Sequence, residues 1–211
     1  TTTKKATTTK KAATAKKTAT KASTAKAAAA KPTRLSFFGA SHTSADLWTG
    51  HIRRLLQTRY GDRGRGFILP AAPFPGYRGA DVNLCRTSGW LSDHSGIPSG
   101  LSPRPLGFAG MSVRSSDASE FGWLETTRDN PQGRRVARFD VYSLGGPDAS
   151  PYQVSVDDTP PRSVLPELRE KGLHRAQIRV PDGGHRLRLQ PSGKGEVRFF
   201  GVSMERDGPG V

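Results

Sequence analysis

Ser41 is the residue whose type and setting could do chemistry most directly. It lies in the stretch FFGASHTSADLW, where a short apolar run stops at Gly39 and a helical pattern begins a few residues later. A serine at the carboxyl end of a strand, beside the first turn of a helix, has its hydroxyl in the crevice where open α/β sheets bind ligands. The free amides of that turn stabilise negative charge that develops beside it. This setting favours a nucleophile, with ordinary turn chemistry as the alternative.

The residues around Ser41 are expected to support it rather than to react. His42 is adjacent to Ser41, and adjacent residues rarely face each other as nucleophile and base, so we expect His42 to shape a pocket together with Gly39 and Thr43. A catalytic base must therefore come from elsewhere.

The sequence predicts no metal and no cofactor. Cys85 is the only cysteine, so neither an intrachain disulfide nor a cysteine-based zinc site is expected. The histidines show no H-x-H or H-x-x-x-H spacing. Asp157 and Asp158 precede Thr-Pro-Pro, where acids usually solvate a turn, with calcium binding as the alternative.

A strand and a helix are expected to hold Ser41 in place. Leu35, Phe37 and Phe38 predict a short strand buried on both faces. Apolar residues then recur with helical spacing and predict one buried stripe of a helix, formed by Leu47, Trp48, Ile52, Leu55, Leu56 and Tyr60. Thr43 or Ser44 can cap its start and Gly61 can end it.

This strand, turn and helix carry a family resemblance. The segment FFGASHTSADLWTGHIRRLLQTRYGDRGRGF resembles block I of the SGNH, or GDSL-type, esterases. The resemblance implies that Ser41 attacks an ester carbonyl and that its backbone N–H contributes to the oxyanion hole. Ala40 departs from the pattern, because the family usually has Asp at that position.

The last residues carry a second resemblance. EVRFFGVSMERDGPGV is similar to the segment where, in some bacterial SGNH proteins, the chain leaves an inserted β-sandwich and returns to the hydrolase sheet. Those proteins resemble peptidoglycan or polysaccharide O-acetylesterases with a carbohydrate-binding-module-like insert. The resemblance implies further blocks, with the oxyanion-hole glycine, an asparagine and an Asp-x-x-His pair, which this sequence is not expected to contain.

The middle of the chain predicts the β-sandwich independently. From Leu106 onward, short β-type segments alternate with turns such as NPQG, GGPD and PDGG. In HRLRLQ, Leu187 and Leu189 point one way and the arginines between them the other, and Phe200, Val202 and Met204 are expected to alternate similarly. This pattern is typical of an antiparallel sandwich with one buried and one wet face.

Residues 62–105 are rich in Gly, Pro and Ser and predict a long surface connection. Its aromatic residues either line a sugar groove or hold the loop down; they are Phe67, Phe74, Tyr77 and Trp90.

The net charge of +15 is concentrated in the first residues. Residues 1–34 hold nine lysines and Arg34 and no acid, among Thr and Ala. A segment without large apolar residues cannot offset its ordering entropy, so we expect a disordered tail. Spaced lysines bind polyanions such as nucleic acid, anionic lipid or wall polymers by releasing counterions, while the alternative is a solvated linker.

Together these features predict an α/β plus all-β chain with four parts. They are a disordered tail (1–33), a partial SGNH α/β/α domain (34–105), a jelly-roll-like β-sandwich insert (106–206) and the start of the return to the hydrolase domain (207–211). The leading hypothesis is a serine esterase that removes acyl groups such as acetyl from peptidoglycan or another polysaccharide. The alternatives are a non-catalytic carbohydrate-binding protein and a polyanion-binding protein that acts through its tail.

Analogy favours the cell envelope, the periplasm or secretion and leaves a cytoplasmic location open. No apolar stretch has membrane-spanning length.

Overall fold

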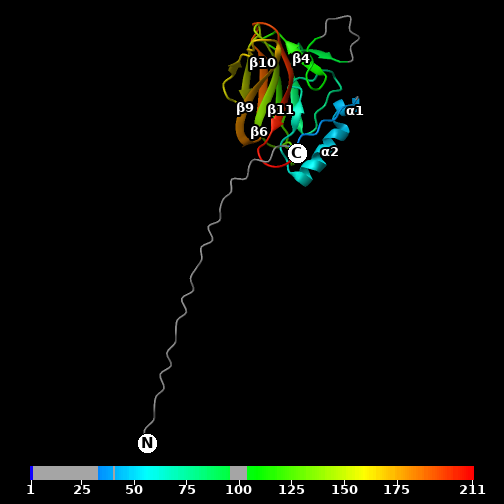
Figure 1. The fold of residues 1–211 in the computed structure, drawn as a ribbon, viewed down its shortest axis with the longest axis vertical. Helices are drawn as coiled ribbons and strands as arrows, with labels where there is room; N and C mark the ends of the chain where they lie inside the picture. The colour runs from blue at the N-terminus through cyan, green and yellow to red at the C-terminus, as the bar shows by residue number, and fades with distance from the viewer. Residues whose placement is uncertain (2–32, 40, 96–103) are drawn as a thin grey trace.

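The computed structural model describes Thr1 and residues 33–39, 41–95 and 104–211. These residues form two helices, followed by the strands of two sheets (Figure 1). The elements are α1 (Ser41–Ser44), α2 (Leu47–Tyr60), β1 (Gly66–Ile68), β2 (Val82–Arg86), β3 (Leu91–His94), β4 (Met111–Ser115), β5 (Gly122–Thr126), β6 (Val136–Gly145), β7 (Tyr152–Val156), β8 (Arg162–Val164), β9 (Gly172–Gly183), β10 (Arg186–Pro191) and β11 (Val197–Glu205).

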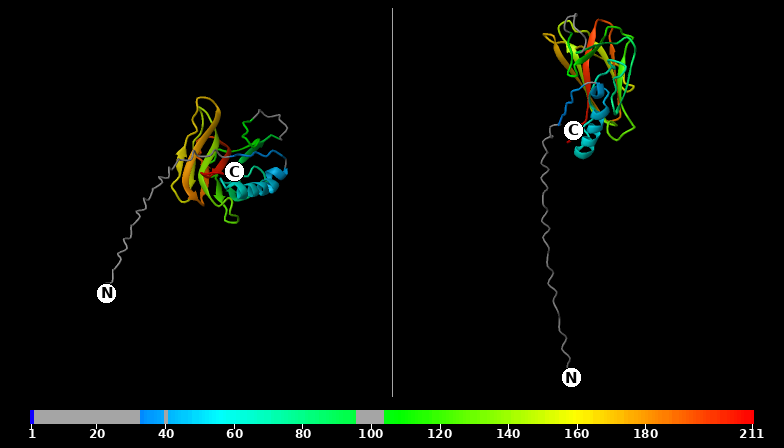
Figure 2. Two further views of the ribbon diagram at one scale, coloured as in Figure 1. Left: turned by 60° about the horizontal axis from the view of Figure 1, so that its bottom comes forward. Right: turned by 90° about the vertical axis from the view of Figure 1, so that its right-hand side faces the viewer.

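The strands form the two layers of a β-sandwich. One sheet has the order β3-β4-β11-β6-β9, with β1 also paired to β11, and the other has the order β2-β5-β10-β7-β8. Every pairing between these strands is antiparallel. Figure 2 shows the two layers facing each other, with the helices beside them. The prediction of an antiparallel sandwich is confirmed.

Alternation of apolar and polar residues explains how the strands form the core. In β10, Leu187 and Leu189 are fully buried between the sheets, while Arg186 and Arg188 are exposed, as the sequence predicts. In the centre of the core, the ring of Phe199 packs edge-on against Tyr152 with centroids 5.0 Å apart, and the ring of Trp90 lies 5.9 Å from that of Phe199. These rings join the two layers.

β11 departs from simple alternation. The predicted common face of Phe200, Val202 and Met204 is wrong, because the register against β6 shifts between Phe199 and Gly201. The cluster between the sheets therefore contains Phe199, Val202 and Met204, whereas Phe200 is buried outside that cluster. A β-bulge moves one residue out of the alternation, which a periodic pattern in the sequence does not reveal.

The segment at residues 62–105 is more structured than the predicted surface connection. It contains β1, β2 and β3, which join both sheets of the sandwich. These strands are short, and Gly and Pro between them concealed their periodicity in the sequence.

The predicted strand around Leu35, Phe37 and Phe38 is wrong. These residues form no strand, and the exposed fraction is 52%, 37% and 76% respectively. A strand buried on both faces needs neighbouring strands and a layer on each side, whereas all the named strands of the described residues belong to the sandwich. An α/β hydrolase sheet is therefore not observed in the described residues. The predicted disordered tail falls almost wholly on residues 2–32, which lie outside them.

The core analysis yields a stability prediction. Phe199→Ala removes a fully buried ring that joins the layers, so we expect a loss of about 4 kcal/mol in the free energy of unfolding. Phe108→Ala is the matched control, because that ring is 64% exposed and its loss should cost less than about 1 kcal/mol. Urea unfolding measures both, and equal losses would contradict the described core.

Candidate functional site

Helix α2 follows directly on the Ser41 segment and turns its apolar stripe outward. The predicted helix is confirmed at Leu47–Tyr60, but the predicted buried face is wrong. Its buried residues are Thr49, Gly50 and Gln57. The stripe residues that are exposed by 40% or more are Leu47, Trp48, Leu55 and Tyr60.

A buried ionic network explains this orientation. Asp46, which precedes α2 with a left-handed φ of 53°, receives a hydrogen bond of 2.7 Å from Arg65 and one of 2.9 Å from the backbone N–H of Ala80. Arg53 on the inner face of α2 pairs with Asp46 at 3.3 Å and with Asp81 at 2.9 Å. The helix therefore packs through charges and hydrogen bonds rather than through apolar side chains.

Close approach also explains the small residues on that face. A Cβ added at Gly50 would lie 2.8 Å from the Cβ of Ala80. At the far end of the helix, the amide of Gln57 donates to the carbonyl oxygen of Gly64 at 2.7 Å. A larger residue at Gly50 would separate α2 from the loop that supplies the Asp46 contacts.

The charges of the network depend on one another. Burial lowers the pKa of Arg65 to about 10, with a further contribution from Arg53, while Asp46 opposes the shift. Burial raises the pKa of Asp46, but the neighbouring Arg65 and Arg53 outweigh it and hold that pKa below its ordinary value. Removal of the Asp46 charge would leave a buried guanidinium without its closest partner.

The Ser41 segment begins α1 at the exposed side of this network. Ser41 is the first residue of α1, and the backbone N–H of Asp46 donates to the carbonyl oxygen of Thr43 at 3.0 Å. A Cβ at Gly39 would collide with the hydroxyl oxygen of Thr43, so a larger residue there would require the Thr43 side chain to move. His42 is exposed. The role of Ser41 as a nucleophile stays a prediction.

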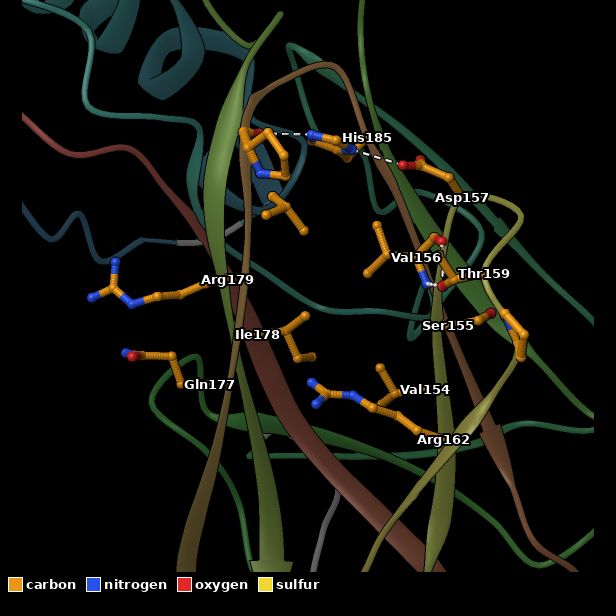
Figure 3. Close-up of a pocket in the computed structure, with 13 residues that line it drawn as sticks. Val154, Ser155, Val156, Asp157, Thr159, Arg162, Gln177, Ile178, Arg179 and His185 are labelled. Carbon is orange, nitrogen blue, oxygen red and sulfur yellow. Dashed lines mark hydrogen bonds and ion pairs between the residues drawn. The ribbon is translucent and has the colours of Figure 1, made fainter.

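A second candidate site lies at the open edge of the sandwich. A cleft of about 380 Å³ separates β7 and β8 of one sheet from β9 of the other. Figure 3 shows Val154, Val156 and Ile178 pointing into this cleft from its two sides, with the guanidinium of Arg162 between them. No pattern in the sequence indicates the cleft, because its walls meet only when the two sheets pack.

His185 closes one end of the cleft. Its Nδ1 lies 2.7 Å from a carboxylate oxygen of Asp157, and its Nε2 lies 2.7 Å from the carbonyl oxygen of Pro181 (Figure 3). Each ring nitrogen thus lies within hydrogen-bond distance of an oxygen acceptor, which anchors the imidazole at this end of the cleft. Burial raises the pKa of Asp157, but the hydrogen bond from His185 outweighs it and lowers that pKa.

The structure shows the contacts of several residues that the sequence singled out. Asp157 lies in a turn and accepts a hydrogen bond from the backbone N–H of Arg186 at 2.8 Å, and the described residues contain no group of three potential ligands for a metal.

Trp90 belongs to the core, and Tyr77 accepts a hydrogen bond from the backbone of Leu69. These aromatic residues hold the connection against the sandwich, as do Phe67 and Phe74, and none of them lines the cleft.

Comparison with known proteins gives partial similarities of fold. No protein-family model matches the sequence, and no curated protein matches it. A family 35 carbohydrate binding module from Clostridium thermocellum is 10% identical, with 60% of this chain and 98% of that chain covered and a TM-score of 0.40. A family two carbohydrate esterase from Cellvibrio japonicus is 14% identical, with 69% and 34% covered and a TM-score of 0.31.

The first of the similar structures is a family GH115 4-O-methyl-alpha-glucuronidase, BtGH115A. It is 14% identical with a TM-score of 0.36, and the similarity covers 48% of this chain and 15% of that chain. The chain thus spans a small part of that enzyme. Similarities this low say nothing of what the chain binds. No helix in the described part of the chain is long and apolar enough to cross a membrane.

The ionic network around Asp46 yields a prediction for the stability of the protein. Asp46→Asn should lower the free energy of unfolding by about 3 kcal/mol, because it leaves Arg65 buried without a charged partner. Asp148→Asn, an exposed acid in a turn, should change it by less than about 0.5 kcal/mol.

The same residue predicts a dependence on pH. Because the folded pKa of Asp46 is lowered, its contribution is complete above the unfolded pKa of about 4 and is lost as the pH falls through the folded value. Urea unfolding from pH 7 to pH 3 should therefore show a smaller acid-induced loss for Asp46→Asn than for the natural sequence. Parallel curves for the two proteins would contradict a charged Asp46 in the network.

Proposed function

We propose that the described β-sandwich binds a polysaccharide in the cleft between β7, β8 and β9. The observation that carries this proposal is the combination of apolar walls and convergent polar groups in one concave site. Sites for small ligands typically have volumes of about 300 to 1,000 Å³ and a few placed polar groups. A cleft of about 380 Å³ has room for a sugar residue of a longer chain.

The chemistry of the lining suits a sugar. The apolar surfaces of Val154, Val156 and Ile178 can contact the C–H faces of a pyranose ring, whose burial is favourable. The guanidinium of Arg162 lies between these side chains and adds a charged group to the lining (Figure 3).

Variants of one strand test this function. Val180→Trp should fill the cleft and reduce retention on the polysaccharide that binds best by about tenfold, because Val180 lines it. Leu173→Trp is the matched control on the same strand, 63% exposed and outside the cleft. Affinity electrophoresis in gels with xylan, a β-glucan or soluble peptidoglycan fragments measures retention, and thermal unfolding checks that both variants fold.

Retention of Val180→Trp equal to that of the control would contradict binding in the cleft. Absence of retention on any of these polymers would contradict the proposed function as a whole.

We propose ester hydrolysis through Ser41 as a second candidate function. It is supported by the position of Ser41 as the first residue of α1. In this proposal the Ser41 hydroxyl attacks an acyl ester, such as an acetyl group on peptidoglycan or another polysaccharide, and its own N–H stabilises the oxyanion. The remaining catalytic groups are assigned to no residue here.

The proposed setting is the cell envelope, the periplasm or the exterior of the cell. There, the lysine-rich residues 1–33 would add a salt-sensitive attraction to anionic polymers. The division into a tail, a partial hydrolase domain and a sandwich insert is part of this proposal.

The esterase proposal has its own test. Ser41→Ala in the natural protein should lower the hydrolysis of a chromogenic acetate ester at least a thousandfold, because a methyl group cannot attack the carbonyl. Ser36→Ala, in the exposed segment before the turn, should keep the full rate. Undiminished hydrolysis by Ser41→Ala would remove the nucleophile assignment and leave the binding proposal intact.

A further inference from the structure

The cleft continues into a second cavity at the same end of the sandwich. This cavity has a volume of about 620 Å³ and a mainly polar lining. Asp157 and His185 line both the cleft and this second cavity, so the pair forms the boundary that the two cavities share. The other residues of the second cavity are Glu125, Thr126, Thr127, Arg128, Arg134, Gly184 and Arg186. The two cavities together form a continuous surface, which we call the end groove.

The acidic side chains of the end groove are already paired. Glu125 forms an ion pair with Arg186, with 3.0 Å between a carboxylate oxygen and a guanidinium nitrogen. Asp157 is paired with His185 at 2.7 Å and also accepts the backbone N–H of Arg186. Neither carboxylate is therefore available to neutralise another cation in the groove.

Three guanidinium groups of the end groove have no carboxylate partner among the described residues. Arg162 lies in the apolar cleft (Figure 3), and Arg128 and Arg134 line the polar cavity. Arg134 does donate to the carbonyl oxygens of Asn130 at 2.9 Å and Arg128 at 3.0 Å, which fixes its position and leaves its charge uncompensated. Arg179 also borders the cleft, but it points away from it and pairs with Asp207.

The guanidinium of Arg162 lies beside the apolar side chains of the cleft, Val154, Val156 and Ile178, which we call the apolar floor. The guanidinium also lies near the buried hydroxyl of Tyr152, whose pKa burial raises to about 12 against an opposing contribution from Arg162. A hydrogen bond with Ser143 also opposes this rise in the pKa of Tyr152. Arg162 itself is exposed, so an anionic group can reach its guanidinium directly from solvent.

We propose that the end groove selects an acidic polysaccharide, with a sugar residue over the apolar floor and its anionic group against Arg162. Arg128 and Arg134 then face the anionic group of another residue of the same chain in the polar cavity. The planar guanidinium fork matches a carboxylate through two parallel N–H···O bonds. This inference rests on the proposed polysaccharide binding and adds the charge of the ligand and the residues that recognise it.

Matched polymers and matched variants test the inference in the full chain. Carboxymethyl cellulose and hydroxyethyl cellulose share one backbone and differ in charge, so affinity electrophoresis in each at about 0.15 M salt isolates the effect of the carboxylates. Arg162→Gln should lower the affinity for carboxymethyl cellulose about tenfold and leave hydroxyethyl cellulose unchanged. The double variant Arg128→Gln with Arg134→Gln should show the same selectivity.

Arg188→Gln is the matched control. Arg188 is an exposed arginine of β10 that stacks on Phe121, 4.0 Å from its ring centre, outside both cavities. Arg188→Gln removes one positive charge, as Arg162→Gln does. Because Arg188 lies outside both cavities, we expect neither affinity to change. Every variant keeps the lysine-rich tail, so differences between variants report on the groove.

The outcomes separate the inference from the proposed function. Equal loss on both polymers with Arg162→Gln would keep polysaccharide binding and overturn the selection of acidic chains. Unchanged affinity for carboxymethyl cellulose in all variants would overturn the groove and assign that affinity to the tail. Dextran sulfate in place of carboxymethyl cellulose tests the anionic group: weaker dependence on Arg162 supports a carboxylate, and stronger dependence would contradict it.

Discussion

The ion pair between Asp46 and Arg65 is the interaction on which the arrangement of the helical part depends. Both groups are buried, and the pair links the start of α2 to the chain just before β1. Two desolvated charges are costly unless each finds its partner in good geometry. Asp46 meets this requirement with a hydrogen bond from Ala80 and a second cation, Arg53. The position of α2 is therefore fixed by a few directional contacts.

This constraint has a consequence for the other face of α2. A helix held through its polar side leaves its apolar stripe in contact with solvent, as Leu47 and Leu55 show. The exposed rings of Phe37 and Trp48, with centroids 5.2 Å apart, continue this surface toward the turn that contains Ser41. Grouped exposed apolar side chains of this kind are a common feature of interaction surfaces.

Sequence patterns revealed the elements better than their surroundings. Alternation in β10 and the helical spacing from Leu47 onward depend on nearby residues, and both predictions were confirmed. The buried side of α2 depends on Arg65 and Asp81, which come later in the chain, so periodicity alone identified a stripe without revealing its partner. Pairing could have been suspected at Asp46, an acid directly before a helix whose inner face carries arginines. The end groove combines strands and turns that are distant from one another in the sequence, so no short sequence pattern indicates it.

We propose that the sandwich recognises the polysaccharide and that ester hydrolysis takes place at the start of α1. Nuclear magnetic resonance of the nitrogen-15-labelled chain, titrated with a short oligosaccharide of the polymer that binds, tests this most directly. The account predicts that amide shifts concentrate in residues 154–162 and 177–186, which border the cleft on both sides. Shifts confined to residues 35–60, or spread only over the lysine-rich tail, would contradict it.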